Sequence, residues 1–68
     1  MKIHYDSKTD LLYIRIGEKE QNVTSHEVKK GIVVDFGATG KLVGIEILDA
    51  SGRVDLEKLL PIEIASAH

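Results

Sequence analysis

The chain has 68 residues, with 9 Lys plus Arg against 11 Asp plus Glu and no Cys, so it fits one small domain, residues 1–68, without disulfides or thiolate zinc sites. The near balance of charge argues against electrostatic capture of nucleic acid or of an anionic membrane. Because no apolar run reaches the ~18 residues of a spanning helix and no signal-peptide pattern opens the chain, the sequence predicts a soluble, cytoplasmic protein.

The N-terminal part of the chain predicts a β-hairpin. Lys2–Tyr5 and Leu11–Ile16 are expected as strands, because turn-forming residues fill positions 6–10 between them. Placing the apolar side chains of both strands on one face determines the pairing. The expected partners are Tyr5 with Leu12, Ile3 with Ile14, His4 with Tyr13 and Lys2 with Arg15.

Three further strands are expected. Val23–Val28 is an irregular or edge strand, whereas Ile32–Phe36 and Lys41–Leu48 are rich in β-branched and apolar residues, as buried strands are. Gly37–Gly40 predicts a tight hairpin turn whose last glycine suits the left-handed region. A bulge there would shift the facing by one residue, so the register across the turn stays open. Gly44, inside a strand, predicts a bulge or the close approach of another backbone.

The periodicity changes after these strands. Apolar spacing in Val54–Leu60 is compatible with two helical turns, which Pro61 would end. Ile62–Ile64 alternates and predicts a short strand or a packed tail. The expected fold class is therefore α+β: a small antiparallel β-meander of about four strands with a short C-terminal helix packed against one face of the sheet.

Four segments, taken in order, carry a resemblance to a known family. They are Ile3-x-Tyr5-Asp6, Leu12–Ile16, Gly31–Asp35 and Gly40–Ser51. With them the chain resembles the short prokaryotic proteins of the domain of unknown function 2283 family over nearly its whole length up to Ser51. The resemblance implies a compact β-rich fold without an established activity. Because some relatives are suspected members of toxin–antitoxin-like pairs, it also suggests that this chain is the neutralising partner in such a pair. It assigns no functional residue.

Three histidines raise the question of a metal site, because neutral imidazole is a common transition-metal ligand. His4, His26 and His68 lie 22 and 42 residues apart, whereas a metal site needs three or four converging ligands. Each is therefore expected to be a surface histidine, and neither a metal nor a cofactor is predicted. His4 is the best placed of the three, since it belongs to an expected strand.

Two carboxylates, Asp35 and Glu46, lie in strands otherwise built largely from apolar residues. Such a pair could perform general acid–base chemistry if burial and mutual repulsion separated their pKa values. Alternatively the two acids mark the less buried face, or pair with Arg15 or another cation across neighbouring strands. Together with His4 and Arg15 they form a candidate polar site. No catalytic residue is assigned, because the sequence offers no companion nucleophile.

The expected strands carry apolar side chains on both faces, whereas an antiparallel sheet with one wet face alternates cleanly. One short helix cannot cover both faces, and large exposed apolar patches usually mark partner surfaces. The residues expected at such an interface are Leu11, Tyr13, Val33, Leu42 and Leu48. The leading prediction is thus a homo-oligomer, most simply a two-fold dimer.

The sequence therefore predicts a non-enzymatic interaction module that self-associates. The second possibility is that its partner is a different protein. One alternative is a small nucleic-acid-binding accessory protein that uses Tyr13, Arg15, Lys2 and His4. Its basic residues are scattered among acids and lack the interleaved aromatics of a single-strand platform. The other alternative is a minor metal-binding or hydrolytic domain that uses His4, Asp35 and Glu46.

Overall fold

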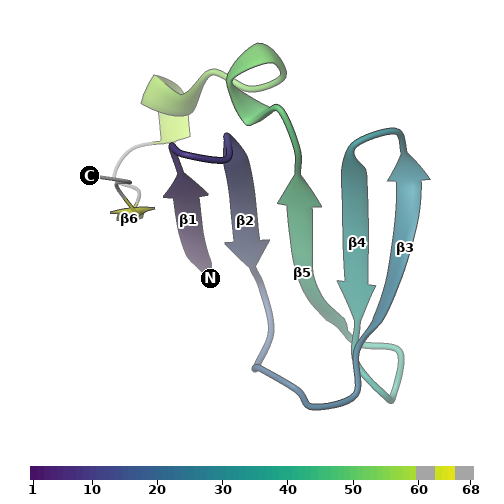
Figure 1. The fold of residues 1–68 in the computed structure, drawn as a ribbon. Coiled ribbons are helices and arrows are strands. Elements are labelled where there is room, and N and C mark those ends of the chain that lie inside the picture. Colours follow the sequence, from purple (N-terminus) through teal and green to yellow (C-terminus); the bar gives the residue numbers. More distant parts are fainter. Residues whose placement is uncertain (60–62, 66–68) are drawn as a thin grey trace.

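The fold is a six-stranded β-sheet, seen in a computed structural model that describes residues 1–59 and 63–65 (Figure 1). The strands are β1 (Lys2–Asp6), β2 (Leu11–Arg15), β3 (Thr24–Lys29), β4 (Ile32–Phe36), β5 (Leu42–Ile47) and β6 (Glu63–Ala65). Their order across the sheet is β3-β4-β5-β2-β1-β6. Neighbouring strands are antiparallel except β1 and β6, which run parallel. Two short 3-10 helices, η1 (Ala50–Gly52) and η2 (Leu56–Leu59), follow β5.

The β1–β2 hairpin has the predicted register. The predicted pairs Lys2–Arg15, Ile3–Ile14, His4–Tyr13 and Tyr5–Leu12 are all present. The turn ends at Asp10, whose φ of 55° lies in the left-handed region, which a short polar side chain tolerates better than most residues. The pairing could be predicted because only this register keeps the apolar side chains of both strands on one face.

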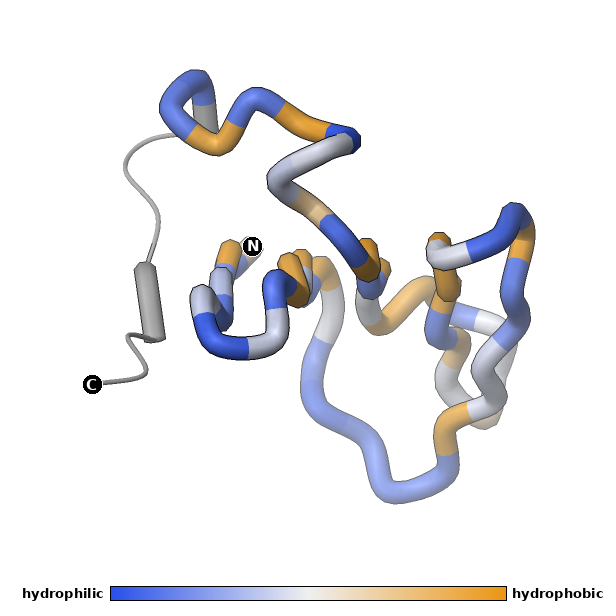
Figure 2. Tube along the Cα trace, turned by 45° about the horizontal axis from the view of Figure 1, so that its top comes forward, coloured by the Kyte–Doolittle hydropathy of each residue, from blue (hydrophilic) through white to orange (hydrophobic). Residues whose placement is uncertain are grey.

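The prediction of a simple meander is wrong at the third strand. β2 pairs with β5 rather than with β3, so the antiparallel sheet joins the β1–β2 hairpin to a separate β3–β4–β5 meander. The connection over residues 16–23 is a largely hydrophilic arc that passes the ends of β5 and β4 (Figures 1 and 2). Six extended residues already reach about 20 Å, farther than the ~15 Å of three strand spacings. The connection over residues 16–23 is therefore long enough to place β3 at the edge of the sheet, beyond β5 and β4.

The β4–β5 turn confirms the predicted role of its last glycine. Gly40 has a φ of 83°, and its amide donates to the Gly37 carbonyl at 3.0 Å. The register that the sequence left open contains a bulge. Because the pairing shifts by one residue between Asp35 and Phe36, Val43 of β5 is the extra residue at this point.

The predicted C-terminal α-helix over Val54–Leu60 is wrong for the described residues of that stretch. η2 is a single 3-10 turn, in which the Lys58 amide donates to the Asp55 carbonyl at 3.1 Å with the i→i+3 spacing of that helix type. A stretch of this length is too short to propagate an α-helix without extensive packing. The chain is thus β-rich rather than clearly α+β.

The predictions for the end of the chain are tested only in part. β6 at Glu63–Ala65 is a short strand, which agrees with one of the two possibilities for Ile62–Ile64. The predicted helix end at Pro61 lies in residues 60–62, which together with residues 66–68 are outside the described part of the chain.

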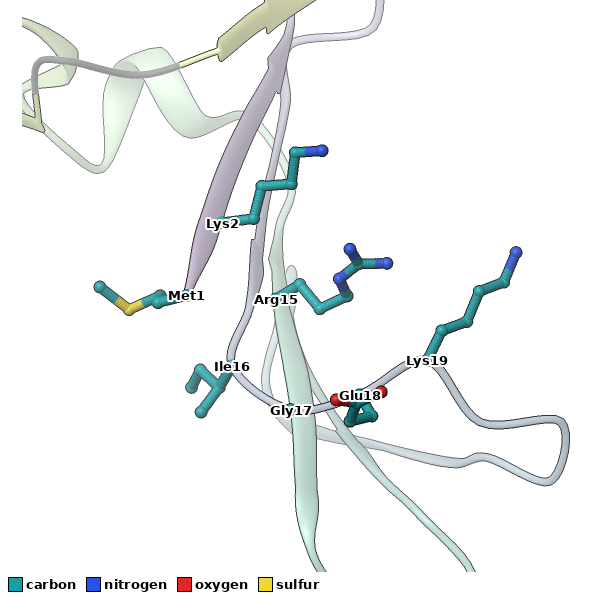
Figure 3. Close-up of a pocket in the computed structure, with 7 residues that line it drawn as sticks. All are labelled: Met1, Lys2, Arg15, Ile16, Gly17, Glu18 and Lys19. Atoms are coloured by element: carbon teal, nitrogen blue, oxygen red, sulfur yellow. The ribbon is translucent and has the colours of Figure 1, made fainter.

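The two faces of the sheet differ in composition. Alternation along the strands and the observed registers place Ile3, Leu12, Ile14, Val34, Ile45 and Ile47 on one side, here termed the apolar face. The opposite side, termed the polar face, carries Lys2, His4, Tyr13, Arg15, Val33, Asp35 and Glu46. Figure 3 shows the split at one end of the sheet, where Ile16 points to one side and Lys2 and Arg15 point to the other.

The apolar face is covered at one end only. The η1 segment lies against the β1–β2 turn, because the Ala50 amide donates to the Asp10 carbonyl at 3.0 Å, and both Ala50 and Leu12 are fully buried. Neither 3-10 helix lies over β3 or β4 (Figure 1). The side chains on this face that remain partly exposed are Ile3, Ile14, Val34, Ile45 and Ile47. These aliphatic side chains therefore keep part of their surface exposed to solvent.

Candidate functional site

Two carboxyl groups meet on the polar face between β4 and β5. Asp35 pairs with Gly44 and Val33 with Glu46, so the two acids are diagonal neighbours across the strand pair. Asp35 is only 5% exposed, and the Ser25 hydroxyl of β3 donates to its Oδ1 at 2.6 Å. A hydrogen bond also joins Asp35 to Glu46. The structure thus brings together two of the four predicted polar-site residues.

The pair is arranged to hold a proton. Burial raises the pKa of Glu46 above its ordinary value of 4.5, and the hydrogen bond with Asp35 and the negative charge of that neighbour raise it further. Two adjacent carboxyl groups that share a proton have the elements of a general acid–base pair. A nucleophile or substrate-binding group beside them would be needed for a reaction, and Ser25 is engaged as a donor to Asp35.

Tyr13 packs over this pair from β2. A Cβ atom added at Gly44 would lie 2.7 Å from Cζ of Tyr13 and 3.0 Å from the Ile14 carbonyl oxygen, so the glycine leaves room for the ring. The close approach predicted at Gly44 is therefore made by a neighbouring side chain and backbone. Burial raises the pKa of the Tyr13 phenol, and the negative charges of Asp35 and Glu46 raise it further. The hydroxyl accordingly keeps its proton at neutral pH.

The basic groups of the polar face lie on the other side of Tyr13. A hollow of about 290 Å³ is lined by Lys2, His4, Tyr13 and Arg15, and these residues belong to the paired strands β1 and β2. Of the remaining two predicted polar-site residues, His4 lies on β1, two strands away from Glu46. Arg15 pairs with Gly44, the partner of Asp35, and it lines a third hollow of about 280 Å³ together with Asp35. No group of three potential metal ligands forms among the described residues.

The five predicted interface residues are distributed over this same side of the sheet and its margins. Leu11, Tyr13 and Val33 are partly exposed beside charged groups, and Leu42 lies at the bulge. Leu48, just after β5, is 44% exposed. Their role as an interface stays a prediction.

Sequence reasoning missed two parts of this arrangement. The first part is Ser25, which contacts Asp35 because the β3–β4 register pairs these two residues across a turn. A serine at this position does not by itself indicate that contact. The Asp10 carboxylate, which accepts hydrogen bonds from Tyr5 and Ser51, is the second part. The run of turn formers before Leu11 was the available signal, because such residues hydrogen-bond locally.

A family model described as a protein of unknown function (DUF2283) matches residues 2–51. The chain belongs to this family. The matched DUF2283 region spans β1–β5 and enters η1, so it contains the whole antiparallel sheet and both groups of polar-face residues. This confirms the resemblance read from the sequence.

Searches of curated proteins and of solved structures return no match for this DUF2283 chain. Among its described residues, none of the helices has the length and hydrophobicity needed to cross a membrane.

Proposed function

We propose that this DUF2283 protein is a non-enzymatic interaction module that self-associates as a two-fold dimer through its apolar face. The observation that carries the proposal is the open part of that face. Its aliphatic side chains over β1, β2, β4 and β5 are left partly exposed, and neither 3-10 helix covers β3 or β4 (Figure 1). Apolar surface of this kind gains free energy when a partner removes it from water.

The exposed area supports a partner of ordinary size. A compact chain of this mass exposes about 4,200 Å², whereas this chain exposes 4997 Å². The excess of about 800 Å² is comparable to what each partner buries in a protein interface of standard size. Small chains without disulfides commonly obtain part of their stability from a second subunit.

The apolar face suits self-association better than the other surfaces do. A dimer through the polar face would bury Arg15, Asp35 and Glu46, and removing charges from water costs several kcal/mol per ion unless each is well paired. Pairing along the free edge of β3 is opposed by the charged Glu27 and by the register shift before Lys29, features that protect edge strands. A two-fold axis instead sets identical aliphatic patches against each other.

Sedimentation equilibrium at micromolar concentration tests this proposal, with a matched pair of variants. Ile16 and Leu48 are 42% and 44% exposed, but Ile16 lies on the side of the apolar face (Figure 3), and alternation past Ile47 puts Leu48 on the other side. We expect the wild type to sediment at twice 7.5 kDa, Ile16→Glu to weaken the dimer at least tenfold, and Leu48→Glu to leave it intact.

Val34→Asp, on β4 within the apolar face, is the second variant and should also weaken the dimer, with circular dichroism to verify its fold. A wild type that remains a monomer would overturn the proposal, and so would a dimer weakened by Leu48→Glu alone. The second result would favour the five residues predicted from the sequence. A stoichiometric complex with a different protein and no homodimer would favour the heteromeric, toxin–antitoxin-like alternative.

A further inference from the structure

The polar face has a feature that self-association through the opposite face does not use. Arg15 lines three hollows of the molecule. One of them extends to Met1 and Ile16 at the edge of the apolar face, and another includes the acids Glu20 and Asp35. Within the described residues the Arg15 guanidinium has no hydrogen bond or ion pair, although it is partly buried. A guanidinium presents five donors in a planar fork that matches the oxygens of a phosphate or carboxylate group. Arg15 is therefore equipped to bind an oxyanion.

The surroundings of Arg15 complete a set of donors. The hollow of about 290 Å³ has a lining composed entirely of Lys2, His4, Tyr13 and Arg15, each of which can donate a hydrogen bond. Among the residues whose side chains the structure describes, no carboxylate lines this hollow.

The neighbouring hollow adds more positive charge. It measures about 430 Å³, and its charged lining consists of Lys2, Arg15 and Lys19 with one acid, Glu18; Met1, Ile16 and Gly17 complete the lining. In Figure 3 the side chains of these three cations extend to the same side of the strands, whereas Met1 and Ile16 extend to the other. The positive charge is thus concentrated at the β1–β2 end of the polar face, although the whole chain has a net charge of −2.

The size of the anion is limited by the carboxyl pair. Asp35 and Glu46 occupy the same face on β4 and β5, next to Tyr13. A long polyanion that crossed the sheet would be repelled by them, whereas a compact group could stay over β1 and β2. The single aromatic ring in the lining also gives no row of stacking platforms for successive bases. These constraints favour a small ligand over a nucleic-acid strand.

We propose that the polar face of this protein binds a small phosphate-bearing ligand, with Arg15 as the bidentate anchor, Lys2 and Lys19 as flanking cations, and His4 as an additional donor. The site would work in the monomer or in the dimer, because it faces away from the apolar face. Inorganic phosphate and a short phosphomonoester share the relevant chemistry, and the two sources are separated in the experiment below.

The test is titration of the isotope-labelled protein with inorganic phosphate, pyrophosphate and adenosine monophosphate, followed by backbone amide shifts. We expect saturable shifts confined to β1, β2 and the residues just after β2. Arg15→Gln should weaken binding about tenfold or more, since charge-assisted hydrogen bonds are the strong ones. Lys29→Gln on β3 removes the same charge from an exposed position outside the site and should change the affinity less than twofold.

Arg15→Lys separates geometry from charge, and we expect it to recover only part of the affinity because the fork is lost. Tighter binding of adenosine monophosphate than of inorganic phosphate would identify an organic phosphate as the better ligand. Equal losses in Arg15→Gln and Lys29→Gln would overturn the proposal, as would non-saturable shifts in the wild type. Affinity for oligothymidylate that rises with strand length would also overturn it, in favour of a nucleic-acid surface. Thermal melting of each variant verifies folding.

Discussion

Asp10 and the Asp35–Glu46 pair are two places where carboxyl groups enter the hydrogen bonding of this sheet, and they differ in what faces them. The Asp10 carboxylate accepts from the Tyr5 hydroxyl at 2.7 Å, and from the Ser51 amide and hydroxyl at 3.0 and 2.7 Å. At the other place, a carboxyl group faces a second carboxyl group, and Ser25 supplies one donor.

The difference appears in the direction of the pKa shifts. Hydrogen bonds from Tyr5 and Ser51 hold the pKa of Asp10 below its ordinary value of 3.8, whereas burial and the proximity of Asp35 raise the pKa of Glu46 above 4.5. A carboxylate surrounded by donors stabilises the fold in its charged form, and a carboxyl beside another acid does so in its protonated form. Asp10 thus stabilises the fold as a carboxylate, whereas the Asp35–Glu46 pair favours a protonated carboxyl group.

The largest expected effect is that of Asp10→Ala. This substitution removes the acceptor for three hydrogen bonds that join β1 to η1, and it places alanine at a φ of 55°, where an L side chain is strained. We expect the greatest fall in Tm of the variants discussed here, measured by circular dichroism. Asp10→Asn should lose less, because asparagine tolerates the left-handed region and keeps an acceptor oxygen.

Ser51→Ala is the matched control, since it removes only the hydroxyl donor to Asp10 and leaves the Ser51 amide in place. If Asp10→Ala lowered Tm no further than Ser51→Ala does, Asp10 would not be the group that holds η1 on the sheet.

Gly44→Ala is expected to have the next largest effect, and it probes the packing beside the carboxyl pair. The added Cβ would approach Tyr13 Cζ at 2.7 Å and the Ile14 carbonyl oxygen at 3.0 Å, so overpacking should destabilise the protein by about 1–3 kcal/mol. Urea unfolding measures this loss. Gly52→Ala, where nothing lies within 4 Å of an added Cβ, should stay within about 0.5 kcal/mol of the wild type.

Tyr13→Phe sharpens this test, because it removes the hydroxyl that the new methyl group would meet. In the Gly44→Ala background it should recover part of the loss, which appears as a coupling free energy in a double-mutant cycle. Strict additivity of the two substitutions would show that Tyr13 does not lie over Gly44.

Ser25→Ala should have a smaller effect on the pair, about 1 kcal/mol, the typical value of one hydrogen bond. The variant leaves Asp35 buried with one donor fewer, so β3 should loosen at the edge of the sheet. Hydrogen exchange should therefore speed up in β3 while the amides of β1 and β2 stay protected. Faster exchange throughout the sheet would contradict the assignment of Ser25 to a local edge contact.

The parts of the fold that the sequence predicted are those in which neighbouring residues in the chain also pair in space. The β1–β2 register follows from the alternation around Ile3 and Ile14, and the left-handed Gly40 follows from turn chemistry. Pairing of β2 with β5 could not be read in this way, because no local pattern states which strand lies beside which. The 3-10 turns after β5 could not be predicted for a similar reason, since packing rather than periodicity decides how a short segment folds.

The candidate site shows the same limit. Asp35 and Glu46 could be selected as acids in apolar strands, and alternation correctly placed Lys2 opposite Arg15 and His4 opposite Tyr13. The contact of Ser25 with Asp35 and the position of Tyr13 over Gly44 depend on strand order, so they became visible only in the assembled sheet. The predicted interface role of Leu11, Tyr13, Val33, Leu42 and Leu48 stays a prediction, because strand order alone does not decide which face meets a partner.

Glu46→Gln has the smallest expected effect at neutral pH and the most specific dependence on pH. The folded-state pKa of Glu46 is raised, so its protonated form favours folding below the unfolded value of 4.5, and this contribution is lost as pH rises from 4.5 through the folded value. Tm of the wild type should therefore decline by a few degrees across that window relative to Glu46→Gln, which cannot ionise.

Asp10 has the opposite sign and a different window, which makes the comparison decisive. Its folded pKa lies below 3.8, so its contribution is present above 3.8 and is lost as pH falls through the folded value. Asp10→Asn should thus remove the fall in Tm below pH 3.8 and leave the decline in Tm above pH 4.5 in place. Glu46→Gln should remove the decline above pH 4.5 and leave the fall below pH 3.8 in place. If both variants altered the same limb of the Tm–pH profile, the two carboxyl clusters would not be electrostatically distinct, because groups that shift in opposite directions cannot produce the same limb.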